Sequence, residues 1–340
     1  MNKKAVTILM FLLLLITVIL PLQKIFASEQ TQKIEQVKLR VAVEYTNHAA
    51  SFYYAESKKM FQQAGIEIEE AKIYASGVAV AVAFTKEDFD AGYMCLVPAI
   101  FTYANGGVPL KIIAGTHKNG YALVVRSSKI KKLKDLESKG IKIANGPKGT
   151  STDFLQMIMI RDKNLSAEKV LSNTVRMNTT KQLMALFAGK VDAIFVPEHF
   201  ATLALAFPGI KTLLRSEDIW PDMQGSVLVV AERLLKSDPA TVKKLYEINK
   251  ISLKGINDNP RHAAVIIAEK LNINQEKIKI ETKSPNSRIE VNSDIVLESI
   301  KNMNMTEEIS VDEVQKVIDE MFELGYLSKS FKAEEIMASR

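Results

Sequence analysis

Short apolar segments alternate with helical stretches along most of the chain. Residues 37–43 alternate apolar and charged positions and contain three valines, which predicts a strand. Residues 49–64 carry apolar side chains at helical spacing, and Gly65 ends this predicted helix. Further strands are predicted at residues 66–73, 89–93, 110–115, 121–126, 141–144, 174–177, 192–196, 210–214 and 226–230, and further helices at 78–84, 151–161, 181–188, 198–207, 260–271 and 311–324. Strands separated by helices of this length predict βαβ units and a mainly parallel sheet.

Two of these strands are similar in character, which indicates how the chain is divided. Residues 121–126 and 226–230 are both apolar runs, and each is a candidate for a crossover between two lobes. We therefore expect an α/β protein with two doubly wound lobes joined by two hinge strands, and a ligand cleft between the lobes. The expected division is 37–120 for the first part of lobe 1, 121–126 and 225–231 for the hinge strands, 127–224 for lobe 2, and 232–340 for the completion of lobe 1 with C-terminal helices.

The first 27 residues differ from the rest of the chain. They contain Lys3, Lys4 and Lys24 but no acidic residue, and a run of 16 residues at 5–20 is apolar except for two threonines. A basic start, an apolar stretch and small residues near Ala27 are typical of a cleaved signal peptide. We expect an exported protein on the periplasmic or extracellular side of a membrane. The alternative is an uncleaved anchor, although a spanning helix needs about 20 apolar residues.

Composition narrows the class of protein further. The 340 residues are 47% hydrophobic and 25% charged, as in ordinary globular proteins rather than disordered or fibrous ones. The single cysteine, Cys95, excludes an internal disulfide and a zinc site built on paired cysteines, and its position argues against a lipid anchor near Ala27. Removing residues 1–27 takes away three lysines and no acid, which lowers the net charge from +6 to +3. A nucleic-acid-binding function loses its main support with those lysines.

Polar and aromatic residues that directly follow predicted strands are the candidate ligand-binding residues, because doubly wound sheets bind ligands beyond the carboxyl ends of their strands. In residues 146–152, two glycines let the backbone approach a ligand, and Thr150 and Ser151 offer donors to an anion at a helix N-terminus. The spacing of this segment is not that of a P-loop. The candidates are Tyr45, Asn47, His48, Tyr74, Ser76, Gly77, Tyr93, Met94, Thr116, His117, Gly149, Thr150, Ser151, Glu198 and His199.

Simpler structural roles are open to many of these residues. Asn47 and Thr150 are also typical helix caps, and such a cap needs no ligand. His48, His117 and His199 could converge on a metal ion, but no pair of them has ligand-like spacing. We expect no metal, no cofactor and no catalytic residue, since no Ser-His-Asp order, carboxylate pair or activated cysteine stands out.

Several blocks of sequence resemble one known family. The chain is similar to the extracytoplasmic solute-binding proteins of ABC importers, in the group that binds aliphatic sulfonates, taurine and nitrate. Relatives in that group bind thiamine-precursor pyrimidines. The resemblance lies in the order and spacing of residues 89–92 (FDAG), 98–101 (PAIF), 106–114 (GGVPLKIIA), 122–130 (ALVVRSSKI), 133–136 (LKDL), 139–144 (KGIKIA), 185–193 (ALFAGKVDA), and 259–260 with 263–264.

This resemblance implies the type 2 periplasmic binding protein fold, with two lobes and two hinge strands. It departs from the family in two places. In the strand before Pro197 the family often has an aromatic residue, where this chain has residues 195–199 (FVPEH), and the cysteine cluster of the pyrimidine-synthesising relatives is missing. The resemblance also implies a function and partners. We expect a monomeric solute-binding protein, not an enzyme, that captures a small organic anion and delivers it to an ABC permease in the membrane, without contact to nucleic acid.

Two alternatives to this function stay open. The ligand could be a thiamine-precursor pyrimidine or a similar heterocycle, or the chain could be a synthase-like enzyme on the same scaffold. A sensor ectodomain is a further alternative if residues 5–20 remain in the membrane. A sulfonate would depend on Thr150 and Ser151, whereas a heterocycle would depend more on the tyrosines Tyr45, Tyr74 and Tyr93.

Overall fold

Apolar strands form two mixed sheets, and capped helices pack against both faces of each sheet. The computed structural model describes residues 36–85, 89–277 and 290–338, with the side chains of residues 273–277 left out. The chain divides into two units, Met1–Val37 and Lys38–Arg340, and the elements below belong to the second, apart from Val37 at the start of β1. The predicted signal peptide lies outside the described residues. Within the described part of the chain, no helix is long and apolar enough to cross a membrane.

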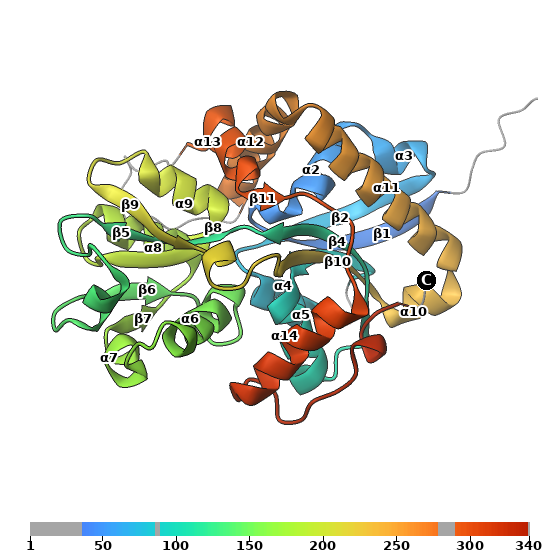
Figure 1. Ribbon diagram of the computed structural model, residues 1–340. Coiled ribbons are helices and arrows are strands. Elements are labelled where there is room, and N and C mark those ends of the chain that lie inside the picture. Colours follow the sequence, from blue (N-terminus) through green and yellow to red (C-terminus); the bar gives the residue numbers. More distant parts are fainter. Residues whose placement is uncertain (1–35, 86–88, 278–289, 339–340) are drawn as a thin grey trace, which may run out of the picture. The chain divides into compact units, whose positions relative to one another are not determined.

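Sheet A is the larger sheet and receives strands from three separate parts of the chain. Its order is β11 (Met303–Asn304), β4 (Leu110–Asn119), β10 (Gln224–Ala231), β3 (Ala91–Cys95), β1 (Val37–Glu44) and β2 (Ile66–Tyr74). Its helices are α2 (Ala50–Ser57), α3 (Met60–Gln63), α4 (Gly77–Phe84), α5 (Leu96–Gly106), α10 (Glu232–Ser237), α11 (Pro239–Asp258), α12 (Pro260–Lys277), α13 (Ser293–Lys301) and α14 (Val311–Glu323). In Figure 1, α2, α11 and α12 lie on one side of this sheet and α4, α5 and α14 on the other.

Sheet B is built from one continuous stretch of the chain. Its order is β7 (Thr174–Arg176), β6 (Ile143–Asn145), β8 (Ala193–Pro197), β5 (Tyr121–Arg126) and β9 (Ile210–Arg215). Its helices are α6 (Ser151–Asp162), α7 (Ala167–Ser172), α8 (Thr179–Phe187) and α9 (Glu198–Leu205). Short 3-10 helices are η1 (Asn47–Ala49), η2 (Leu133–Glu137), η3 (Ser216–Asp218) and η4 (Ala333–Glu335). The protein is therefore an α/β protein of two lobes, as predicted.

The prediction of mainly parallel sheets was wrong. β1 pairs with β3 in parallel, and β6 pairs with β7 and β8 in parallel, but β10 runs antiparallel to both β3 and β4. In sheet B, β5 runs antiparallel to both β8 and β9. β5 and β10 enter their sheets directly from the other lobe, without a crossover helix, so the rule that βαβ units give parallel pairs does not apply to them.

The two passages between the sheets are short. The chain leaves sheet A at Asn119 and enters sheet B at Tyr121, with Gly120 at φ 91° between them. Asn119 itself has φ 60°, a left-handed conformation that asparagine tolerates better than most residues. The chain returns from β9 to β10 through residues 216–223, which include η3. β5 thus lies wholly in sheet B and β10 wholly in sheet A.

Local signals explain where helices begin and break. Thr150 caps α6 by accepting a hydrogen bond from the Asp153 N–H, and Ser310 and Glu313 form a capping box at α14. The helix predicted over residues 49–64 is instead divided into α2 and α3, because Lys59 adopts φ 56° between them. Helical spacing of apolar residues continues through this break, so the sequence pattern does not reveal it.

Candidate functional site

A cleft between the two lobes gathers the ends of strands and the starts of helices. Its empty space is about 400 Å³, including open solvent at its mouth. The lining residues are Glu44, Ser76, Gly77, Cys95 and Pro98 from the lobe of sheet A, and Tyr121, Gly146, Pro147, Thr150, Ser151, Thr152, Asn178, Thr179 and Pro197 from the lobe of sheet B. The starts of α4, α5, α6, α8 and α9 all reach this cleft. This is the position where doubly wound sheets bind their ligands.

The Glu44 carboxylate lines the side of the cleft formed by sheet A. Its Oε2 atom accepts hydrogen bonds from the Cys95 backbone N–H at 3.2 Å and from the Cys95 thiol at 3.0 Å. The backbone N–H of Gly77 also bonds to this carboxylate. Burial raises the pKa of Glu44, and these three hydrogen bonds oppose the rise. Cys95 is the N-cap residue of α5, without a capping hydrogen bond from its side chain, and Gly77 is the first residue of α4. One side-chain carboxylate therefore lies at the N-termini of two helices.

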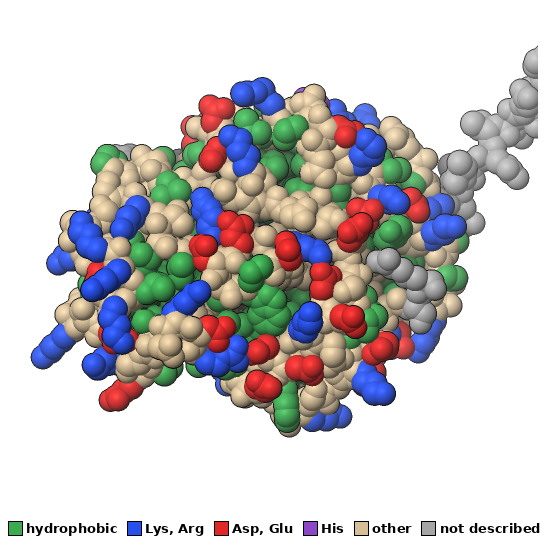
Figure 2. Space-filling model, in the orientation of Figure 1, with side chains coloured by type: hydrophobic (Ala, Val, Ile, Leu, Met, Phe, Trp, Pro, Cys, Tyr) green, Lys and Arg blue, Asp and Glu red, His purple; other side chains and the backbone are tan. Residues whose placement is uncertain are grey.

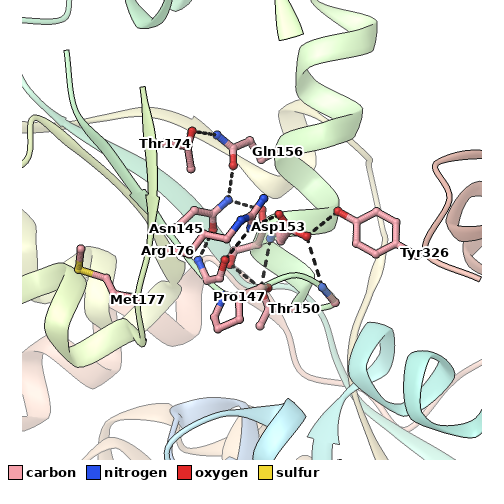
Figure 3. Close-up of polar contacts among 12 residues, drawn as sticks. Asn145, Pro147, Thr150, Asp153, Gln156, Thr174, Arg176, Met177 and Tyr326 are labelled. Carbon is pink, nitrogen blue, oxygen red and sulfur yellow. Dashed lines mark hydrogen bonds and ion pairs between the residues drawn. The ribbon is translucent and has the colours of Figure 1, made fainter. Parts of the chain in front are cut away.

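The opposite side of the cleft is the start of α6, which a polar network holds in place (Figure 3). Buried Asp153 accepts hydrogen bonds from the Tyr326 hydroxyl at 2.6 Å and from the Gly149 N–H at 3.3 Å, and it forms an ion pair with Arg176. Arg176 also donates to the Gly146 carbonyl at 2.9 Å. The α6 N-terminus is thereby fixed against β7 and against the segment that follows α14.

Beside this network, Ser151 presents a hydroxyl to the cleft. The residue is 3% exposed, and its Oγ lies beside the Tyr121 hydroxyl but makes no well-formed hydrogen bond within the described part of the chain. A buried polar atom without a partner costs about 1–3 kcal/mol, so native proteins rarely leave one without a reason. Ser151 lies at the first position of α6, where N–H groups also lack helical partners. A bound solute would complete these hydrogen bonds.

The cleft lining contains an acidic side chain but no basic one. The lining side chains include the carboxyl group of Glu44 but no lysine, arginine or histidine. Arg176, near the α6 N-terminus, is committed to Asp153 and the Gly146 carbonyl. Pro98, Pro147 and Pro197 supply apolar wall instead.

Four of the residues predicted from the sequence lie in the cleft lining: Ser76, Gly77, Thr150 and Ser151. Ser76 accepts a hydrogen bond from the Ala79 N–H at 3.3 Å, so it also serves as the N-cap of α4. Gly149 is adjacent to the lining and donates to Asp153.

Six further candidates form a second buried polar cluster where the lobes meet: Tyr45, Asn47, His48, Thr116, His117 and His199. The His199 Nδ1 atom lies 3.1 Å from Asn47 Oδ1, and the Tyr45 ring contacts the His199 ring edge-on at 6.3 Å. The His48 and His117 ring centroids are 4.2 Å apart, and His48 Nε2 lies 2.8 Å from the Gly120 carbonyl oxygen. These residues line the junction between the sheets rather than the cleft.

The other candidates lie in different surroundings. Tyr93 and Met94 are buried in the core of sheet A, and the Tyr74 ring packs edge-on against Phe89 at 6.0 Å. Glu198 accepts from Asn302 Nδ2 at 2.8 Å and lies 3.4 Å from Arg215. Burial raises the pKa of Glu198 to about 7, against the lowering effects of Arg215 and Asn302.

The sequence analysis missed Glu44, Cys95, Tyr121 and Asn178. Glu44 and Cys95 are the last residues of β1 and β3, one position before or after the candidates chosen there. Side chains alternate along a strand, so the residue facing the cleft is one position away from the residue facing the core. The lone acid ending an apolar strand, Glu44, is a signal that could have identified this position.

Metal binding finds no support in the described ranges. They contain no group of three or more His, Cys, Asp or Glu side chains arranged to hold a metal ion. His48 and His117 are close together, but His199 instead contacts Asn47.

Three solved structures that are similar to this one are of ligand-binding proteins, all at low sequence identity. The alkanesulfonate-binding protein SsuA from Xanthomonas axonopodis pv. citri, bound to MOPS, matches with a TM-score of 0.73 and 15% identity, over 89% of this chain and 99% of that one. A ligand-binding component of an ABC-type import system from Staphylococcus aureus, with zinc bound, matches with a TM-score of 0.72 and 16% identity, over 89% and 97%. The periplasmic nitrate-binding protein NrtA from Synechocystis PCC 6803 matches with a TM-score of 0.68 and 14% identity, over 87% and 83%. The fold is that of the type 2 periplasmic binding proteins.

Sequence comparison identifies the family. No curated protein matches the sequence. The model of the NMT1-like family matches residues 32–283, which is most of the chain, and the chain therefore belongs to the NMT1-like family.

Proposed function

We propose that this protein is the solute-capturing component of an ABC import system. The observation that carries the proposal is the cleft between the lobes, on which the starts of five helices converge beside the unpartnered Ser151 hydroxyl. A solute held by both lobes binds their closed arrangement better than an open one, so binding favours closure. The closed form then docks on a membrane permease and releases the solute.

The structural neighbours support this proposal. Two of the neighbours named above are an alkanesulfonate-binding and a nitrate-binding protein, and a third is a ligand-binding component of an ABC-type import system. All share two lobes with this chain over most of its length. The fold alone does not select a ligand, since it carries several in these neighbours.

The arrangement around Cys95 argues against an enzyme that uses this thiol. Burial raises the pKa of Cys95 well above its ordinary value, and the nearby Glu44 carboxylate raises it further. The His48 Nδ1 atom lies 3.7 Å from the sulfur, and burial holds the pKa of His48 well below its usual range. A neutral thiol beside a neutral imidazole and a carboxylate is a poor nucleophile.

Location and domain division belong to the same proposal. Residues 1–27 direct export, and the mature protein acts as a monomer on the outer side of the membrane. Lobe 1 comprises residues 37–120 and 232–340, and lobe 2 comprises 127–224. Sheet membership supports this division, because β6 to β9 all lie between the two passages from one sheet to the other.

The sequence leaves two classes of ligand, and the cleft supports them differently. Helix N-termini and the hydroxyls of Thr150 and Ser151 suit a small organic anion of the sulfonate, taurine or nitrate kind. The Tyr121 ring, three prolines and the Glu44 carboxylate suit a nitrogen heterocycle such as a thiamine-precursor pyrimidine.

Thermal unfolding of the purified protein with candidate solutes tests the capture function. Sulfonates, nitrate, bicarbonate and pyrimidines are screened at concentrations well above the expected Kd, where stabilisation follows RT ln(1 + [L]/Kd). A solute that raises Tm in the wild type should lose at least tenfold in affinity in Ser151→Ala. Ser172→Ala is the control, because Ser172 is an exposed hydroxyl in the same lobe that donates to the Lys169 carbonyl. Equal loss in both variants, or no stabilisation by any solute, would contradict the proposal.

A further inference from the structure

The helix N-termini around the cleft already hold acidic groups of the protein itself. The Glu44 carboxylate accepts from the N–H groups of Cys95 and Gly77 at the starts of α5 and α4. Asp153 accepts from the Gly149 N–H just before α6. Glu198 is the first residue of α9. The positive ends of four of the five helices that reach the cleft are therefore near a carboxyl group of this chain.

Neither the remaining helix, α8, nor the nearby cationic side chains offset these carboxyl groups in the cleft. The N-terminus of α8 is capped by the Asn178 side-chain oxygen, which accepts from the Lys181 N–H at 2.9 Å. Arg176 is paired with Asp153. Lys148 is exposed, and its Nζ lies 5.6 Å from the centroid of the Tyr326 ring, outside the lining. An oxyanion entering the cleft would meet the Glu44 carboxyl group without a lining cation to offset it.

Glu44 is also placed to make contact with a solute. It belongs to the cleft lining, and within the described part of the chain its carboxylate accepts hydrogen bonds only from Cys95 and Gly77, on its own side of the cleft. Ser151 faces the same space from the other lobe with an unpartnered hydroxyl. The cleft thus offers one carboxyl acceptor and one hydroxyl from opposite sides, together with the apolar surface of Tyr121 and the prolines.

We propose that Glu44 sets the ligand class: the cleft takes a small solute that carries an N–H donor, on a neutral or protonated nitrogen, and rejects sulfonates and other oxyanions. This inference rests on the proposed function, since it assumes that the cleft is the solute site. A donor from the solute would give the buried carboxylate the partner that water provides outside the protein. An oxyanion would instead bring like charges together in a partly dry space.

The groups facing Glu44 agree with this assignment. They are the Cys95 thiol and N–H, the Gly77 N–H, and the hydroxyl of Tyr121 across the cleft, whose own proton is donated to the Gly225 carbonyl at 3.2 Å. His48 lies behind Cys95, and burial keeps it neutral. No cation among these groups holds the carboxylate in its charged form, so a protonated nitrogen from the solute is the missing partner.

The test compares two panels of probes on the wild type, Glu44→Gln and Glu70→Gln. One panel contains methylammonium, guanidinium, imidazole and an aminopyrimidine, and the other contains methanesulfonate, ethanesulfonate and nitrate. Tm shifts and titration calorimetry give the affinities. Glu70→Gln is the matched control, because Glu70 lies on β2 away from the cleft and pairs with Arg40 at 2.8 Å.

We expect at least one N–H donor to bind the wild type and Glu70→Gln alike, with a loss of tenfold or more in Glu44→Gln. Oxyanions should leave the wild type unaffected. Wild-type binding of a sulfonate or nitrate that Ser151→Ala weakens would overturn this inference and leave the capture function standing. Failure of every probe in both panels would overturn the inference and the capture function together. The wild-type comparison decides between these outcomes even if Glu44→Gln does not fold.

Discussion

His117 is packed against the backbone at Gly120, between β4 and β5, and at Gly225, near the start of β10. A Cβ atom at Gly120 would lie 3.0 Å from His117 Cε1, and one at Gly225 would lie only 2.1 Å from it. The carbonyl of Asn119 lies 2.6 Å from the same position at Gly225. The imidazole therefore fills space that only glycine leaves free at the start of β10.

Gly225→Ala should destabilise the protein by about 1–3 kcal/mol, because both the His117 ring and the Asn119 backbone must shift to admit a methyl group. Urea unfolding followed by circular dichroism gives the free energy of unfolding. Gly106→Ala is the control, since an added Cβ there meets its neighbours at ordinary contact distances of 3.5 Å. Equal stability of the two variants would show that the start of β10 is packed more loosely than these distances imply.

At the scale of elements, α6 and α14 join the two lobes. Tyr326, just after α14, donates to Asp153 of α6, and its carbonyl accepts from Asn105 of α5 at 2.9 Å. Arg161 of α6 pairs with Glu320 of α14 at 2.6 Å. Figure 2 shows lysines and arginines frequent over the lobe of sheet B and acidic side chains frequent around α14. The contacts of Asp153 with Tyr326 and of Arg161 with Glu320 each join one lobe to the other.

Tyr326→Phe removes the hydroxyl that bonds to the buried Asp153 carboxylate. A hydrogen bond to a charged group contributes about 1.5–3 kcal/mol, so the free energy of unfolding should fall by about that amount. Hydrogen exchange at the start of α6 should also become faster, because Asp153 loses one of its partners.

Tyr103→Phe is the matched control for this variant. Its hydroxyl donates to the Glu335 carbonyl at 3.0 Å in an exposed position, and its loss should cost less than about 1 kcal/mol. If the two tyrosine variants lost equal stability and exchange at α6 stayed unchanged, Tyr326 would not link the lobes.

The elements that the sequence predicted well are those with a strong local pattern. Alternation and β-branched residues located β1, and the Thr150 cap located the start of α6 within one residue. β11 was missed because it is only two residues long and forms a strand by pairing with β4. Strand directions depend on contacts between distant segments, so the mixed pairing could not be predicted from local pattern.

The residues of the candidate site likewise divide into those with a local sequence signal and those without one. Ser76, Gly77, Thr150 and Ser151 lie at helix starts after strands, a position that sequence pattern identifies, and they line the cleft. Glu44 faces the cleft from the end of a strand, and its role depends on α4 and α5 meeting there. That meeting is a tertiary contact with no local signal.

At the scale of the whole molecule, the buried histidines and the buried glutamates have opposite effects on how stability depends on pH. Burial lowers the pKa of His117 to about 4 and that of His199 to about 3, and it lowers the pKa of His48 as well. Burial raises the pKa of Glu198 to about 7 and also raises that of Glu44. In the unfolded chain each group returns to its ordinary pKa, so stability depends on pH in two opposite ways.

The buried histidines should lower stability as the pH falls from about 6.5 to about 4. In this window the unfolded chain binds protons that the folded histidines refuse, and each proton contributes a slope of roughly 1.4 kcal/mol per pH unit. Glu198 acts in the opposite direction, because between about pH 7 and its ordinary pKa the folded state holds the proton that the unfolded state has lost.

Urea unfolding at pH steps from 7 to 4 should therefore show that the free energy of unfolding falls less steeply in His117→Gln and more steeply in Glu198→Gln. His262→Gln is the control for the loss of a histidine, since His262 is exposed. A slope that is the same in the wild type and in His117→Gln would mean that His117 takes up a proton in the folded protein as readily as in the unfolded chain, and the junction between the lobes would then be open to water.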